Sequence, residues 1–252
     1  MTQTKKDHFT AVSQIYGKYR PRYPLAFFKY LASVAPEHER VWDCGTGSGQ
    51  AAIPLAEYFQ EIVATDISQG QLENAQQHPR VKYLVGNAES VPLEDSSVDL
   101  VVSAQAAHWF DTEKYYCEVK RVLKPLGVLA IWCYGMPRVR EDIDAYVEKL
   151  NGDILDSYWP KRVLEDLTYT NIPFPFDELP KQNFQMEAKW TLEQLLAFFR
   201  TWSASERYKQ EHSVDPVSLV EADFIRTWGD PQQLRQITWK IYLRHGRPFP
   251  ND

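Results

Sequence analysis

The sequence predicts an α/β fold in which a doubly wound, mostly parallel sheet is covered by helices on both faces. Between residues 40 and 135, short apolar segments alternate with amphipathic segments of helical spacing. The apolar segments are nearly continuous, which is typical of parallel strands buried on both faces. A glycine-rich turn follows the first of them, as it does in nucleotide-binding folds of this class.

Each expected element follows from a local pattern. Strands are expected in five apolar segments: VW within VWDCGTGSGQ, EIVATD, VKYLVG, VDLVVS and GVLAIW. Apolar residues recur at helical spacing in residues 51–59, after the glycine turn, and again in residues 115–122. Ser68 and Gln71 form a capping-box pattern that predicts a helix through Ala75.

Segments on either side of this unit are expected to complete the molecule. We divide the chain into an N-terminal helical lid, a nucleotide-binding core, a cap and a C-terminal strand, at residues 1–35, 36–135, 136–230 and 231–252. Within the cap, helices are expected at 141–150 and 191–200. Apolar and polar residues alternate from Ile237 to Arg244, which predicts a half-buried strand with NFQMEAKW as its antiparallel partner.

Composition and charge exclude several classes of protein. The chain has 252 residues and a net charge of −6, with Lys and Arg scattered, so nucleic-acid binding is not expected. No run approaches the roughly 18 apolar residues of a membrane span, and the first residues lack the apolar segment of a signal peptide. A cytoplasmic protein is therefore expected. Its eight tryptophans are expected mainly in the core, with an aromatic-lined pocket as the alternative.

The three cysteines, Cys44, Cys117 and Cys133, each lie in an apolar stretch. An odd number cannot pair completely, so reduced core residues are expected. No Cys or His spacing typical of metal ligands occurs, and no metal site is expected.

The glycine turn carries the main functional signal. Gly45, Gly47 and Gly49 alternate, whereas a dinucleotide fingerprint starting at Gly45 would need glycine where Gln50 stands. Asp43 precedes the turn by two residues, and its carboxylate would repel a diphosphate but suits an ammonium group. Backbone N–H groups of the turn can meet a carboxylate. A zwitterionic amino acid joined to a nucleoside would satisfy both, with its ammonium group at Asp43 and its carboxylate at the backbone N–H groups.

Polar residues also follow the second and third strands. Asp66 ends the second strand, where an acid accepts hydrogen bonds from both ribose hydroxyls. The alternative is a purely structural role for Asp66, as a negative charge near the N-terminus of the helix that begins at Ser68. Asn87, Ala88 and Glu89 follow the third strand and are placed to read an adenine edge.

These motifs resemble those of class I S-adenosylmethionine-dependent methyltransferases. The matching stretches are VWDCGTGSGQ, VATDIS, GNAESVPLEDSSVDLVVS and EVKRVLKPLGVLAIW, within residues 38–135. The N-terminal YGKYRPRYP is similar to the entry segment of the branch that contains trans-aconitate methyltransferases. The resemblance implies a Rossmann-like, seven-stranded sheet whose last strand is antiparallel.

The resemblance also implies S-adenosylmethionine as cofactor and a set of contacts to it. Asp43 would lie near the methionine amine, Asp66 at the ribose, and Asn87 with Ala88 near the adenine. Tyr16 and Arg20 would cover the methionine carboxylate. The glycines would pack under the cofactor, and the expected set is completed by Thr46, Ile67, Gln71, Glu89 and Ala104.

Candidate catalytic residues follow the fourth strand, in SAQAAHWFD. Gln105, His108 and Trp109 lie at the carboxyl edge, where open α/β sheets bind ligands. His108 is a candidate base because the usual pKa of histidine is near neutral; the alternatives are a hydrogen bond to backbone or a place in the pocket wall. Trp109 is more typical of a wall.

The expected function is methyl transfer to a small molecule, such as an organic acid or similar metabolite. Two rivals remain at this point. A nicotinamide-dependent oxidoreductase would need a diphosphate seat, which Asp43 and Gln50 disfavour. A non-catalytic sensor or subunit would bind S-adenosylmethionine without turnover. The sequence leaves the acceptor, the methylated atom and the oligomeric state open.

Overall fold

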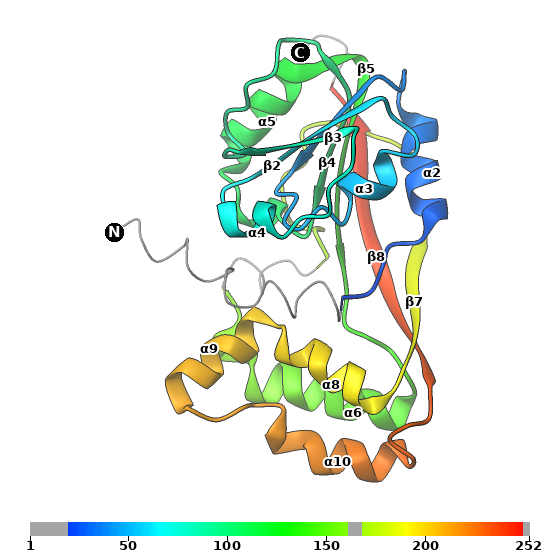
Figure 1. Ribbon diagram of the computed structural model, residues 1–252, viewed down its shortest axis with the longest axis vertical. Coiled ribbons are helices and arrows are strands. Elements are labelled where there is room, and N and C mark those ends of the chain that lie inside the picture. Colours follow the sequence, from blue (N-terminus) through cyan, green and yellow to red (C-terminus); the bar gives the residue numbers. More distant parts are fainter. Residues whose placement is uncertain (1–19, 161–167, 249–252) are drawn as a thin grey trace.

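The computed structural model describes residues 20–160 and 168–248, and they form the expected α/β fold (Figure 1). Five parallel strands lie in the order β3-β2-β1-β4-β5, and β8 pairs antiparallel with β5. Their bounds are β1 Arg40–Cys44, β2 Glu61–Asp66, β3 Val81–Val85, β4 Val98–Ala104, β5 Leu123–Tyr134 and β8 Arg235–Arg247. The mixed Rossmann-like sheet with an antiparallel final strand is confirmed.

Two further strands pair with β8. The seventh main strand is β7 (Phe184–Trp190), which pairs antiparallel with β8 from Ile241 to Arg235, so NFQMEAKW is confirmed as its partner. At the other end of β8, the two-residue β6 (Asp177–Glu178) pairs with Arg247 and Gly246. The described sheet thus has eight strands, one very short strand more than expected.

Helices cover both faces of the sheet. On one side lie α2 (Leu25–Val34) and α3 (Ala52–Leu55), and on the other α5 (Thr112–Val122). Adjacent residues of β1 alternate between these layers, since Val41 packs with α2 and α3 whereas Trp42 packs with α5. The helix after the glycine turn is shorter than 51–59 because its later residues continue as turns. After β2, α4 (Gln69–Glu73) ends two residues before Ala75.

Local sequence explains why α5 forms where it does. The Asp111 side chain accepts a hydrogen bond from the Lys114 N–H and caps the helix. Its buried face is made by the four residues expected from their spacing, Tyr115, Tyr116, Val119 and Val122. Cys117 lies on the opposite face and is exposed. The prediction that it is a core residue is therefore wrong, whereas Cys44 and Cys133 are buried as expected.

A helical cap stands at the carboxyl edge of the parallel strands (Figure 1). It contains α6 (Glu141–Glu148), a π-helical segment at Lys149–Ile154, a 3-10 turn at Asp156–Tyr158, α8 (Leu192–Arg200), α9 (Ser203–His212) and α10 (Ser218–Trp228). Helices at 141–150 and 191–200 are thus confirmed. The described part of the expected N-terminal lid, α2, packs on the sheet through Phe27, Phe28, Leu31 and Ala32.

Aromatic residues fill much of the interior. Trp42, Trp132, Trp228 and Trp239 are among the largest fully buried side chains, which confirms the core interpretation of the tryptophans. Within residues 20–160 and 168–248, no helix has both the length and the apolar character that crossing a bilayer requires.

A buried carboxylate ties β4 to the start of β1. Asp99 is fully buried, and its Oδ2 accepts hydrogen bonds from the backbone N–H groups of Glu39 (2.9 Å) and Arg40 (2.8 Å). Lys124 of β5 lies 3.0 Å from its other oxygen. One side chain therefore satisfies donors from two neighbouring strands.

We expect Asp99→Ala to lower the free energy of unfolding by about 3–5 kcal/mol, because the N–H groups of Glu39 and Arg40 lose a charged acceptor and Lys124 loses one of its three carboxylate partners. Urea denaturation measures this change. Asp95→Ala serves as the matched control, since Asp95 is an exposed partner of Arg121 and its removal costs about 1 kcal/mol or less. Equal effects of the two substitutions would contradict a structural role for Asp99.

Candidate functional site

The glycine turn is tied to β2 by one backbone carbonyl. Thr65 O accepts hydrogen bonds from the N–H groups of both Gly45 and Thr46, each at 2.9 Å. The turn closes on itself where the Gly49 N–H donates to Thr46 O at 3.0 Å. Gly45, Gly47 and Gly49 all have positive φ, at 71°, 57° and 84°. Glycine is favoured at these three positions because it adopts a left-handed backbone without steric cost.

Two of these glycines also allow close contacts. A Cβ atom at Gly45 would lie 2.5 Å from the Ala106 Cβ, so a side chain there would push the loop after β4 away from the turn. A Cβ atom at Gly49 would lie 2.3 Å from the Tyr83 hydroxyl, which donates to Gln76 O at 2.8 Å. The turn is thus packed between β3 and the loop that carries His108.

Asp43 is a fully buried acid at the base of this turn. Its Oδ2 accepts a 2.6 Å hydrogen bond from the Thr46 hydroxyl, while the buried Oδ1 has no hydrogen-bond partner among the described residues. Burial, and secondarily the charge of Asp66, raises the pKa of Asp43 from 3.8 to about 7 against the lowering effect of Thr46. This raised pKa lowers the stability of the ligand-free chain progressively as the pH rises from about 4 to about 7.

Asp66 joins the glycine turn to the loop after β2. Its carboxylate accepts hydrogen bonds from the Gly47 N–H (2.9 Å) and the Ser68 N–H (2.8 Å), and burial raises its pKa. Ile67 beside it is 55% exposed. Gln71, on α4, is buried, and its Oε1 has no hydrogen-bond partner among the described residues.

The turn after β3 lies beside the start of α5. Asn87 is exposed and Ala88 is buried. The Glu89 carboxylate accepts a 3.0 Å hydrogen bond from the Asp111 N–H, and Asp111 is the cap of α5. This contact joins two of the loops that leave the carboxyl edge.

The loop after β4 places His108 in a half-buried position. Ala104 ends β4, Gln105 takes a left-handed φ of 58°, and its N–H donates to Trp132 O at 2.9 Å. A short 3-10 turn, Ala107–Trp109, follows. The His108 ring lies beside Trp109, with 5.0 Å between ring centroids. Burial lowers the pKa of His108 to about 4.

A residue that sequence reasoning missed contacts His108. The Tyr169 hydroxyl lies 3.1 Å from the His108 Nδ1 atom. Tyr169 falls in the stretch 151–180, which is rich in Pro and aromatics and has little periodicity, so no pattern there indicated a site residue.

Arg20 lies between the sheet and the cap. Its guanidinium donates to the Tyr134 hydroxyl at the carboxyl end of β5 (2.5 Å) and to Thr201 O in the cap (3.3 Å). It also lies over the Phe198 ring of α8, 5.4 Å from its centroid. Tyr16, its expected companion, lies outside the described residues.

The donor and acceptor set can hold S-adenosylmethionine. The partnerless Oδ1 of Asp43 suits an ammonium group, and the glycine turn leaves space that a side chain would fill. Two carboxylates, Asp43 and Asp66, flank the turn and would repel a diphosphate. In the described part of the chain, no group of three or more His, Cys, Asp and Glu residues is arranged to bind a metal.

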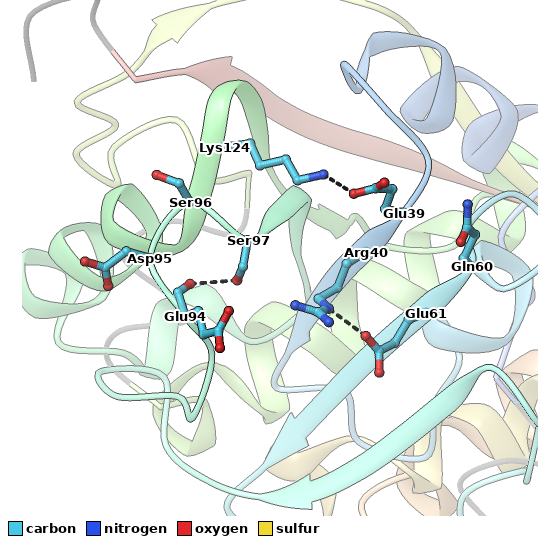
Figure 2. A pocket seen from close by; sticks show the side chains of 9 residues that line it. All are labelled: Glu39, Arg40, Gln60, Glu61, Glu94, Asp95, Ser96, Ser97 and Lys124. Carbon is cyan, nitrogen blue, oxygen red and sulfur yellow. Dashed lines mark hydrogen bonds and ion pairs between the residues drawn. The ribbon is translucent and has the colours of Figure 1, made fainter.

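A separate pocket of about 430 Å³ lies at the opposite edge of the sheet (Figure 2). Arg40 and Glu61 begin β1 and β2, and Lys124 lies near the start of β5. Figure 2 shows that the charged side chains pair across the pocket, Arg40 with Glu61 and Lys124 with Glu39. Parallel α/β sheets bind ligands at their carboxyl edge, so this pocket is not the candidate site.

We expect Gly49→Ala to lower the free energy of unfolding by about 1–3 kcal/mol, since alanine must adopt the left-handed backbone and displace Tyr83. Thermal unfolding followed by circular dichroism measures the loss. The matched control is Gly152→Ala in the cap, where φ is not positive and a Cβ meets nothing within 4 Å. A Gly49→Ala protein as stable as this control would refute the steric account of the turn.

Comparison with known proteins agrees with this geometry. Residues 42–131 match a family model described as a methyltransferase domain. A Dictyostelium discoideum protein that carries the name methyltransferase is 31% identical, over 96% of this chain and 95% of its own length. An uncharacterized methyltransferase of Schizosaccharomyces pombe is 32% identical over 90% of both chains.

A solved structure extends the likeness to the whole fold. It is a protein from Anaeromyxobacter dehalogenans described as a type II methyltransferase, with a TM-score of 0.85 and 39% identity. The match covers 91% of this chain and 99% of that one, so it includes the cap. The chain therefore belongs to the class I S-adenosylmethionine-dependent methyltransferases.

Proposed function

We propose that the chain transfers the methyl group of S-adenosylmethionine to a small molecule that binds between the sheet and the cap. The observation that carries this proposal is the position of the cap, whose helices stand at the carboxyl edge where the glycine turn and His108 lie (Figure 1). A covered edge suits a small acceptor better than a polymer. The net charge of −6 also disfavours a nucleic acid.

The proposed units are those expected from the sequence: a lid at 1–35, the cofactor-binding core at 36–135, the cap at 136–230 and the closing strand at 231–252. The cytoplasm is the proposed location, which the free cysteines Cys44, Cys117 and Cys133 support.

For the cofactor, we assign the methionine amine to Asp43 and the ribose hydroxyls to Asp66. Asn87 and Ala88, with Ile67, Gln71 and Glu89 near them, are proposed to border the adenine. Arg20 with Tyr16 would meet the methionine carboxylate. When bound, S-adenosylmethionine supplies an activated methyl group on a positively charged sulfur. The chain then has to hold the acceptor in line with that methyl group and exclude water.

For the acceptor, we propose an organic acid or a similar metabolite. Gln105, His108 and Trp109 are the residues proposed to face it. The similarity of YGKYRPRYP to the branch that contains trans-aconitate methyltransferases points to the same class.

Incubation with methyl-labelled S-adenosylmethionine and a panel of small carboxylic acids, amines and phenols tests this function. We expect label in a low-molecular-weight acid and none in RNA or added protein. Label in a macromolecule alone would overturn the small-molecule assignment. Tight binding without transfer to any panel member or to a metabolite extract would favour a sensor.

The assignment of Asp43 predicts a proton linkage. At pH 6.5 a carboxyl group with a pKa of about 7 is mostly protonated, and a nearby ammonium favours its ionised form. Binding of S-adenosylmethionine should therefore release more than about half a proton. Calorimetry in two buffers of different ionisation enthalpy measures this number.

Asp43→Asn is the matched variant, because it keeps the shape of the side chain and cannot release this proton. We expect its binding heat to be nearly independent of the buffer and its affinity to be weaker by about tenfold or more. Buffer-independent heat in the wild-type protein would show that Asp43 does not meet the amine.

A further inference from the structure

Tyr169 is a buried residue that the function outlined above does not yet use. It is 1% exposed, and it takes a left-handed backbone conformation with φ of 56°. An aromatic residue rarely adopts this conformation, and such strain persists only where surrounding contacts hold it. Its hydroxyl lies 3.1 Å from Nδ1 of His108, which is 61 residues away in the sequence.

Arg244 on β8 holds the Tyr169 segment in place. Its guanidinium donates to the backbone oxygens of Tyr169 (3.3 Å) and Ile172 (2.6 Å). The same group pairs with Glu178 and lies over the Phe174 ring, 4.7 Å from its centroid. The strained backbone is thus anchored to β8 of the sheet.

The direction of the hydrogen bond between Tyr169 and His108 follows from burial. Burial raises the pKa of Tyr169 well above its usual value, so the hydroxyl keeps its proton. The backbone N–H groups of Ala107 and His108 oppose this effect of burial on the pKa but do not overcome it. The hydroxyl proton needs an acceptor of its own, and among the described residues Nδ1 of His108 is in position.

The opposite arrangement would be costly. If Nδ1 carried a proton and donated it to Tyr169, the buried hydroxyl proton would be left without an acceptor. A neutral imidazole has one protonated nitrogen, so an accepting Nδ1 places the ring proton on Nε2. Burial lowers the pKa of His108 to about 4, which keeps the ring neutral at physiological pH.

We propose that Tyr169 is a positioning residue that holds His108 as the Nε2–H tautomer, so that His108 donates a hydrogen bond to the methyl acceptor and removes no proton from it. The proposal rests on the proposed function and narrows it to acceptors that need no base. A carboxylate is such an acceptor. Its oxygen forms the new C–O bond, the sulfur–methyl bond breaks with its electron pair left on sulfur, and no proton moves.

This role differs from the base that the usual pKa of histidine suggests. A base needs a free nitrogen lone pair facing the acceptor, and in this arrangement the lone pair of Nδ1 is engaged by Tyr169. The Nε2–H group is the one left to contact a ligand, since Nε2 has no hydrogen-bond partner among the described residues.

Nitrogen NMR of protein labelled at its histidine rings tests the tautomer without any acceptor or turnover. We expect a neutral His108 with its proton on Nε2 in the wild-type protein, and a shift toward the other tautomer in Tyr169→Phe. Tyr116→Phe is the matched control, because Tyr116 is also buried and its hydroxyl has no hydrogen-bond partner among the described residues. A wild-type His108 with its proton on Nδ1 would overturn the proposal.

Two substitutions of His108 separate donor from base and remain informative if Tyr169→Phe fails to fold. Glutamine can place an amide N–H near the position of Nε2, whereas asparagine places its amide nearer Nδ1. With an acceptor identified by the labelling assay, we expect His108→Gln to keep turnover within about tenfold and His108→Asn to lose about 10²-fold or more. Equal loss in both variants, with unchanged affinity for S-adenosylmethionine, would indicate a base and refute the donor role.

Discussion

The burial of the Asp43 carboxylate constrains the whole carboxyl edge. An acid without water must be protonated or paired, and here one oxygen is satisfied by Thr46 while the other has no hydrogen-bond partner among the described residues. The turn that supplies Thr46 can bend this sharply because its glycines take left-handed conformations. A cationic group is the natural complement of such a site, and a diphosphate is excluded by the same charge.

Distant segments support the turn on which His108 lies. Because Gly45 has no side chain, the loop after β4 that carries His108 can pack against the glycine turn. Tyr169, which is 61 residues further along the chain, contacts the His108 ring. Arg244 of β8 donates a hydrogen bond to the backbone oxygen of Tyr169 and so connects this segment to the sheet. The orientation of one imidazole thus depends on three segments that are separate along the chain but adjacent in space.

Sequence patterns were sufficient where short-range periodicity controls structure. The five apolar strands, the buried face of α5 and the glycine turn depend on spacing within a few residues, and each was confirmed. The Tyr169–His108 contact joins residues 61 positions apart in a stretch without periodicity, so it could not be predicted. Cys117 was misassigned because its apolar neighbours Tyr115, Tyr116 and Val119 occupy the inward face of α5. The same holds for Arg20, because its two hydrogen-bond partners, Tyr134 and Thr201, lie far from it in the sequence.

The length of β8 has a mechanical consequence. Its 13 residues pair with β5 over one part and with β7 over another, so a single hydrogen-bonded ribbon runs from the sheet to the cap. A flexible tether would let the helices swing as a separate body. The ribbon formed by β8 and its partner strands restricts the cap helices to movements that bend or twist these strands. In the proposed mode of binding, opening of the cap would bend the same strand that carries Arg244, and through Arg244 and Tyr169 it would change the alignment of His108.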